Sequence, residues 1–373
     1  MAHYLEADLQ PWADALTAAL FADGDGGLST EHRASLWHPL DELTPLGDAV
    51  DTVLRASRLP LCQQLLRTPA EWQPAVLRSH TVAGALQLGA ADAAACSDAM
   101  PDMHGVHSLT LRGGLCDARG AETDTQRLCR VVASLRALHS LKTPGLSTPA
   151  YFLAVAPALT SLPLLARLDL NFRCVKKSDA AAVALALAGL PTLTRLRLTT
   201  TGFGSVAGAQ EFAPGLRCLS HLEYLDLSGW HRTGAAGTEL LAPTLGLLTA
   251  LTELHLRTHG CGAIGAQFLA PVLSKCVNLA SLSLGLQFLK RGGAEAIAPQ
   301  LGRCSMLTRL DLSGNSLFDA GTMALAAALG HLSRLASLDL SFNDIGGDGA
   351  VALAPPLGPV SYTHLTLPTT PYV

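Results

Sequence analysis

The sequence has few aromatic residues and few charges. Of its 373 residues, 5% are aromatic and 15% are charged, while 49% are hydrophobic. The formal net charge of −4 argues against a general nucleic-acid binder, which would show a basic excess. A chain this apolar can bury a large core, and its length suits several domains or one elongated repeat array.

The N-terminus and the cysteine pattern also lack familiar signals. Residues 1–12 contain no Lys or Arg, and the longest apolar run, Ala180 to Pro191, is too short to span a bilayer. Nine cysteines occur without Cys-x-x-Cys spacing, so neither a disulfide framework nor a metal site is predicted. Cys276 and Cys304 are predicted to fill the core. We expect reduced thiols, and a location in the cytoplasm or the nucleus.

Internal repetition is the dominant feature of the sequence. The pattern Leu-x-x-Leu-x-Leu recurs with successive spacings of 28, 29, 29, 28, 28 and 28 residues. Weaker versions open at Val106 and Leu138. The strong versions open at Leu165, Leu193, Leu222, Leu251, Leu279, Leu307 and Leu335.

Each repeat predicts a strand, a turn and a helix. In 307–312 apolar and polar residues alternate, which is typical of a strand with one buried face. Gly321 follows fourteen residues after Leu307, and Leu325 and Leu329 follow at helical spacing. Neither element can bury its apolar face alone, whereas stacked neighbours bury both. The predicted class is therefore an α/β solenoid with parallel strands on one side and helices on the other.

From about Val106 to Pro359 the chain resembles the leucine-rich repeat family, in its ribonuclease-inhibitor-like class. The resemblance implies a right-handed horseshoe with a concave parallel sheet, convex helices and a concave face that binds proteins. We accordingly predict an intracellular protein-interaction scaffold. Members of this class also include the Ran GTPase-activating protein, so an alternative is a GTPase-activating protein similar to it. A substrate adaptor is a third option, which needs a recruiting N-terminal domain.

Two departures from the family pattern are visible. Asn at the eighth position after the opening Leu, where the family bonds the turn backbone, occurs only as Asn315 and Asn343. Second, a proline follows the repeat glycine by six residues in five repeats, so the helix either starts near each proline or is kinked there. The other repeats place Arg173, Thr201, Trp230, His259 and Gln287 at the asparagine position, and the prolines are Pro214, Pro243, Pro271, Pro299 and Pro355.

The ends of the chain lack the strong repeat. Residues 1–104 predict an α-helical cap, with a helix over 5–20 and a capping box at 68–71. The stretch 23–31 resembles the middle of an EF-hand loop, but Phe21 and His32 occupy the end ligand positions, so no calcium site is predicted.

Residues 105–359 predict about nine repeats, truncated at the C-terminus. Residues 360–373 resemble the translation of a sequencing-library adapter, although Leu365 and Leu367 also fit a repeat opening. We predict that this segment is not native and that the natural protein continues beyond Pro359.

Candidate contact residues lie between the buried leucines of the predicted strands. Arg167, Arg195, Arg197 and Tyr224 occur on three successive strands, and Arg and Tyr are residue types that dominate interface energetics. The alternative is that charges on adjacent strands only pair with one another. Phe172 and Trp230 follow at strand ends, where Trp230 either points outward or fills the turn core. The pattern predicts no catalytic set, cofactor, metal, nucleic acid, membrane or small-molecule substrate.

Overall fold

The computed structural model describes residues 85–88, 106–111, 129–130, 132–146, 150–172, 177–200, 205–230, 233–257, 260–357 and 364–366. The chain divides into two compact units. The first comprises Met1–Lys142 and Pro157–Leu164, and the second Thr143–Ala156 and Leu165–Val373. The predicted helix over 5–20, the loop over 23–31 and the capping box at 68–71 lie outside the described residues.

The first unit contains parallel strands. β1 (Ala85–Leu88) pairs with β2 (Ser108–Leu111), which pairs with the beginning of β3 (Ser140–Leu146). The weak repeat openings at Val106 and Leu138 thus do precede strands, as predicted. The sequence predicts an α-helical cap over residues 1–104, and the described part of them contains β1, so strand pairing begins before the first predicted repeat. The repeat of β1 has Ala83 in place of the opening leucine, which hid the pattern.

The second unit contains a parallel sheet in which each strand pairs with the next one along the chain. The repeat leucines align in the register, with Leu196 opposite Leu225 and Leu310 opposite Leu338. The strands are β4 (Arg167–Phe172), β5 (Arg195–Thr200), β6 (Tyr224–Asp226), β7 (Glu253–His255), β8 (Ser281–Ser283), β9 (Arg309–Asp311), β10 (Ser337–Asp339) and β11 (His364–Thr366). β11 continues the pairing with Leu365 opposite Leu338, but this does not test the origin of residues 360–373, which stays a prediction.

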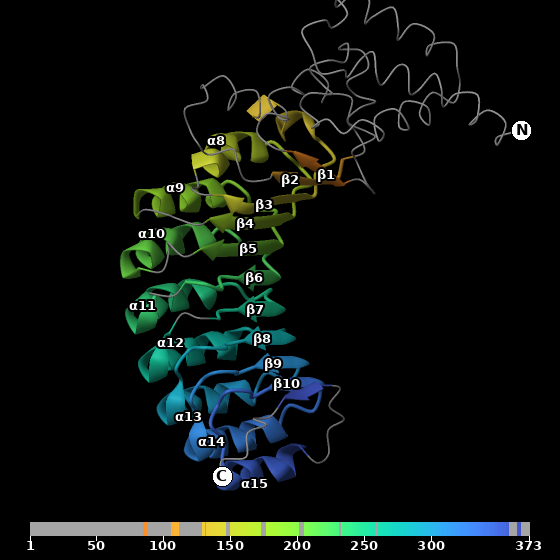
Figure 1. Ribbon diagram of the computed structural model, residues 1–373. Helices are drawn as coiled ribbons and strands as arrows, with labels where there is room; N and C mark the ends of the chain where they lie inside the picture. Colours follow the sequence, from red (N-terminus) through yellow and green to blue (C-terminus); the bar gives the residue numbers. More distant parts are fainter. Residues whose placement is uncertain are drawn as a thin grey trace, which may run out of the picture. The chain divides into compact units, whose positions relative to one another are not determined.

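Helices alternate with these strands and stack beside one another on one side of the sheet of the second unit (Figure 1). They are α8 (Ala150–Leu159), α9 (Lys177–Ala188), α10 (Val206–Leu216), α11 (Gly234–Leu245), α12 (Gly262–Lys275), α13 (Lys290–Leu301), α14 (Phe318–Gly330) and α15 (Gly347–Leu357). Leu310 and Leu312 of a strand, and Leu325 and Leu329 of the following helix, are all at most 2% exposed. The core therefore lies between the strand layer and the helix layer, as the repeat pattern predicts.

The recurring glycine lies in the first turn of α10 to α15, where it packs closely against neighbouring atoms. A Cβ on Gly265 would lie 2.5 Å from the Cβ of Cys261, and one on Gly293 would lie 2.8 Å from the Cβ of Leu289. Real Cβ atoms do not approach so closely. Glycine is therefore required there because the residue four positions earlier already fills the space.

The repeat prolines lie near the ends of their helices. α11 begins nine residues before Pro243, and α13 begins nine residues before Pro299. The alternative in which each helix starts near its proline is therefore wrong. Each proline lacks the amide that would donate to the carbonyl four residues earlier, so one hydrogen bond of each helix is lost near its C-terminal end.

Candidate protein-binding face

The outward side chains of β4 to β10 form a surface that we call the sheet face. The strand register places Arg167 beside Arg195 and Arg195 beside Tyr224. One step along the strands, Arg197 lies between Asp169 and Asp226. The four residues selected from the sequence as sheet contacts are therefore brought together on three adjacent strands.

Arg195 and Tyr224 form a stacked pair. The guanidinium carbon of Arg195 lies 4.3 Å from the ring centroid of Tyr224, a distance at which a cation is attracted to an aromatic face. One Nη of Arg195 also lies 3.6 Å from a carboxylate oxygen of Glu253, and its side chain stays 40% exposed. Partial burial, followed by the nearby Asp226 charge, raises the pKa of Tyr224, so its ring remains a neutral phenol.

Arg197 pairs with the aspartate on the neighbouring strand. Its Nε lies 3.2 Å from Asp226, which is only 9% exposed and also accepts a hydrogen bond from the Ser228 amide. The Arg197 side chain is 52% exposed. The guanidinium of Arg197 is therefore still accessible to other groups, although its partner Asp226 is buried.

Glu253 contacts three charged or titratable side chains of the sheet face, which the sequence did not suggest. Its carboxylate lies 3.6 Å from Arg195, 3.3 Å from Arg309 and 3.8 Å from His255. Arg309 is two strands away from Glu253 and reaches across the small residue Ser281. The predicted pairing of charges on adjacent strands is therefore found for Arg197 and Asp226, whereas Arg195 and Arg309 each pair with Glu253 two strands away. The signal that sequence reasoning missed is the serine that lets the long arginine cross.

Arg167 differs from the other arginines of the sheet face. It is exposed, and none of the residues that the structure describes lies within ion-pair distance of its guanidinium. β4 and β5 together present Arg167, Arg195 and Arg197 against Asp169, which is three positive charges and one negative charge, or a net charge of +2. This end of the sheet face is therefore basic.

Asp311 and Asp339 stabilise the turns that follow their strands. Asp311 accepts hydrogen bonds from the Ser313 amide at 3.0 Å and from the Ser283 hydroxyl at 2.7 Å. Asp339 accepts from the amide and the hydroxyl of Ser341. Both aspartates therefore help to fix the backbone of the turns.

Phe172 and Trp230 do not belong to the sheet face. Phe172 is 1% exposed and its ring lies 6.2 Å from that of Phe152. Trp230 is fully buried, with its ring edge-on to Phe212 at 5.2 Å. Their prediction as surface contact residues is wrong because both rings fill the core. For Trp230 the structure selects the alternative in which it occupies the turn core.

The turn core contains a series of buried polar side chains. Asn315 donates from its amide to the backbone oxygens of Leu284 and Leu312, and its Oδ1 accepts from the amide of Gln287. Asn343 repeats this arrangement one repeat later, and so confirms the role that the family resemblance implied. Arg173, Thr201 and His259 lie outside the described residues.

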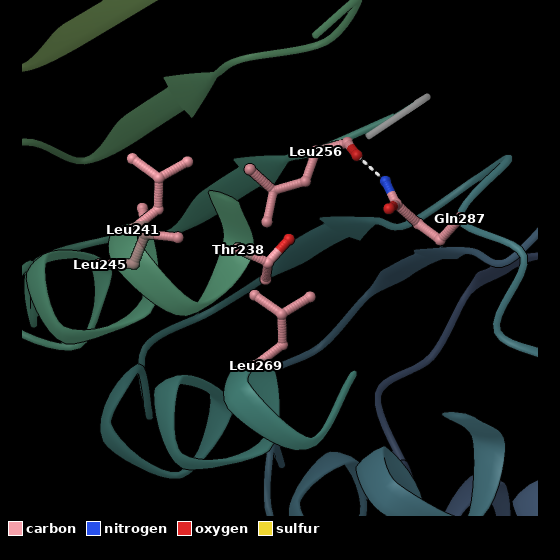
Figure 2. A pocket seen from close by; sticks show the side chains of 6 residues that line it. All are labelled: Thr238, Leu241, Leu245, Leu256, Leu269 and Gln287. Atoms are coloured by element: carbon pink, nitrogen blue, oxygen red, sulfur yellow. Dashed lines mark hydrogen bonds between the residues drawn. The ribbon is translucent and has the colours of Figure 1, made fainter. Parts of the chain in front are cut away.

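Gln287 takes the place of asparagine one repeat earlier. Figure 2 shows its side-chain nitrogen donating to the backbone oxygen of Leu256, above a small cavity lined by the apolar side chains of α11 and α12. The cavity has a volume of about 10 Å³, which is at the lower limit for one water molecule. It is therefore a packing defect rather than a ligand site.

Other kinds of site were sought in the same described ranges. No three of their His, Cys, Asp or Glu side chains are grouped so that they could hold a metal ion. None of their helices combines the length and the apolar character needed to cross a bilayer.

The strand and helix repeats define a parallel α/β solenoid. Residues 303–326 and 332–354 match the leucine-rich repeat family. These residues contain β9, α14, β10 and most of α15, whose register and spacing continue back through the second unit. The chain therefore contains leucine-rich repeats, and their ribonuclease-inhibitor-like subclass stays a prediction.

Comparison with known proteins gives little beyond the family. The comparison with curated proteins found no match. Among solved structures, the chain is similar to one in the crystal structure of the Rad7 and Elc1 complex of yeast, with 14% identity over 88% of this chain and 85% of that one, and a TM-score of 0.41. The GTPase-activating and adaptor alternatives stay predictions.

Proposed function

We propose that the chain is a protein-interaction scaffold that binds its partner on the sheet face of β4 to β6. The observation that supports this most is the Arg195–Tyr224 stack on an open sheet, at 4.3 Å and beside two further arginines. Buried or stacked Arg and Tyr side chains supply most of the binding energy in protein interfaces. Leucine-rich repeats suit the task because a stack of repeats presents a long surface.

The charge of this region indicates the chemistry of the partner. Over β4 to β6 the charges are Arg167, Arg195 and Arg197 against Asp169 and Asp226, a net charge of +1, which favours an acidic segment. Arg195 and Arg197 are 40% and 52% exposed, so a carboxylate of the partner can approach both guanidinium groups while Arg197 keeps its contact with the buried Asp226. Tyr224 supplies the apolar surface between them.

The C-terminal strands are less suited to this role. β8 presents the small residues Ser281 and Ser283, and β10 presents Ser337 and Asp339. Such side chains rarely dominate binding energy. We therefore place the contacts on the N-terminal half of the sheet face.

The experiment begins with a partner identified by affinity purification of the full chain and mass spectrometry. Binding of the purified partner is then measured by calorimetry for wild type, Arg195→Ala, Arg197→Ala and Tyr224→Ala. A central contact residue should cost at least about 2 kcal/mol, or about thirtyfold in Kd. Arg309→Ala is the matched control, since Arg309 also pairs with Glu253 but lies on β9, and it should cost under about 1 kcal/mol.

Two outcomes distinguish this proposal from its competitor. If the triple variant of Arg195, Arg197 and Tyr224 binds the partner as tightly as wild type, these residues only contact one another across the sheet and do not bind the partner. If Arg309→Ala weakens binding as much as Arg195→Ala, the site extends over β9. Affinity should also fall as salt rises, because the attraction depends on exposed charges.

A further inference from the structure

Bulky apolar side chains stand exposed in the turns after β8 and β10 and at the first residue of α14, where the turn after β9 ends. Leu286 is 42% exposed, Phe288 58%, Phe318 51% and Phe342 80%. We call these four residues the turn ridge. Every other phenylalanine with a described side chain is buried or half-buried. The exposed phenylalanines of the described residues are thus confined to three consecutive turns.

The backbone at the turn ridge has a conformation that favours glycine. The φ angles of Leu286, Phe288, Phe318 and Phe342 are 58°, 57°, 51° and 56°. Corresponding positions of other repeats hold glycine, as at Gly260, Gly262 and Gly314 with φ of 62°, 63° and 65°, or a polar residue, as at Ser316, Asp344 and Lys290 with φ of 51°, 53° and 53°. Large L-residues rarely adopt this region because the Cβ atom crowds the following carbonyl. Folding alone would therefore favour glycine or asparagine at these positions, and the apolar side chains need another explanation.

The three turns form a continuous row. The amide of Leu286 donates to the oxygen of Ser313 at 2.8 Å, and that of Phe318 donates to the oxygen of Asn343, the residue after Phe342, at 2.9 Å. Leu286 lies against Gly314, whose missing side chain leaves space for it. Successive strands are spaced by about 4.8 Å, so the row extends over about 10 Å, which equals about two turns of an α-helix.

Charged residues give the row a direction. Lys290 is exposed two residues after Phe288, whereas Asp344 and Asp348 are exposed on the repeat of Phe342. One end of the row is therefore basic and the other end acidic. A membrane surface would favour basic residues throughout, because its lipids are anionic. An amphipathic helix with an acidic end and a basic end complements both the apolar row and its two charged ends.

We propose that the turn ridge binds an amphipathic helix of a partner protein. Its apolar residues at i, i+3, i+4 and i+7 contact Leu286, Phe288, Phe318 and Phe342. Its acidic end lies at Lys290 and its basic end at Asp344 and Asp348. This surface is separate from the sheet residues Arg195 and Tyr224, and it does not rest on the function proposed for them.

The test uses the full chain and a displayed library of amphipathic helical peptides of about 14 residues. Selected peptides are synthesised and their Kd is measured by fluorescence anisotropy. Phe288→Asn and Phe342→Asn should together weaken binding by about thirtyfold and leave the melting midpoint unchanged or higher, because asparagine adopts positive φ readily. Met323→Ser and Val351→Ser are matched controls, being exposed apolar residues of α14 and α15, and should leave Kd unchanged.

Charge reversal tests the orientation. Lys290→Glu should weaken the binding of a peptide whose end at this residue is acidic. It should strengthen the binding of a peptide whose end there is basic. The proposal is overturned if selected peptides bind the two asparagine variants as tightly as wild type, or if these variants lower the melting midpoint, which would assign the phenylalanines to folding. Ridge-dependent binding to anionic vesicles, or ridge-dependent self-association in sedimentation, would overturn it in favour of a membrane or a second copy.

Discussion

The indole nitrogen of Trp230 donates a hydrogen bond of 3.1 Å to the backbone oxygen of Leu198 in the preceding repeat. Asn315 and Asn343 donate in the same way to Leu284 and Leu312, which close the strand motifs of their preceding repeats as Leu198 does. Trp230 therefore donates to a buried carbonyl as Asn315 and Asn343 do in their repeats. Its ring also fills space that the smaller asparagine side chain would leave empty. The repeat accommodates the larger side chain with one extra residue before its glycine.

This relationship predicts a graded response at Trp230. Trp230→Phe keeps most of the packing but leaves the Leu198 oxygen without its donor, so it should cost about 1–3 kcal/mol. Trp230→Ala also leaves a cavity beside Phe212 and should cost about 3–5 kcal/mol. Urea unfolding followed by far-UV circular dichroism measures both changes. Equal losses for the two variants would show that the ring packing contributes little.

Asn315 provides a second test of the turn core. Its side chain bonds two repeats at once: its own through Leu312, and the preceding one through Leu284 and the backbone amide of Gln287. Asn315→Ala leaves these groups buried and unsatisfied, so it should destabilise the protein by at least about 2 kcal/mol. Asn171→Ala is the matched control, since Asn171 is exposed on β4, and it should change stability by less than about 0.5 kcal/mol. A loss at Asn171 as large as at Asn315 would contradict this account.

The strand and helix pattern was predictable because burial imposes it at a fixed period. Leu310, Leu325 and Leu329 are buried where the spacing requires. Trp230 was ambiguous because a large ring with one polar atom suits either a surface or a core that offers a carbonyl. Only the position of the Leu198 oxygen, one repeat earlier, decides between them.

The candidate site was predictable in its membership but not in its contacts. In-phase repeats align Arg195 with Tyr224, so their proximity follows from the spacing. The link from Glu253 to Arg309 depends on side-chain reach across Ser281, which no single repeat reveals. The turn ridge was missed because a positive φ at phenylalanine contradicts local preference, and sequence rules place glycine there.

The strand register predicts a difference between the two faces of β9 and β10. Leu310 is 2% exposed and Leu338 is 1% exposed, so changing either to Ala should cost about 2–5 kcal/mol. Arg309 on the opposite face is 61% exposed, and Arg309→Ala should cost under about 1 kcal/mol. Denaturant unfolding of the three variants provides the comparison. Asp311 is a poor control because its carboxylate fixes the following turn, and its loss should fall between these values.

The last predictions concern the buried thiols of Cys276 and Cys304. Burial raises the pKa of Cys276 and of Cys304 to about 11, from an ordinary value of 9.0. Both residues are free thiols and lie inside the helix-to-strand connections. Because the thiolate is the reactive form, peptide mapping after iodoacetamide treatment at pH 8 should find Cys218, which is exposed, alkylated well before either of them.

The same pKa shift sets a pH dependence of stability. In the folded protein both thiols stay protonated up to about pH 11, whereas the unfolded chain releases these protons above about pH 9. Stability from this source is therefore complete below pH 9 and is lost as the pH rises from 9 to about 11. Replacing Cys276 and Cys304 together by Ala removes both titrations. The urea midpoint of that variant should fall less steeply between pH 9 and pH 10.5 than that of wild type, and parallel curves would show that the two thiols do not titrate on unfolding.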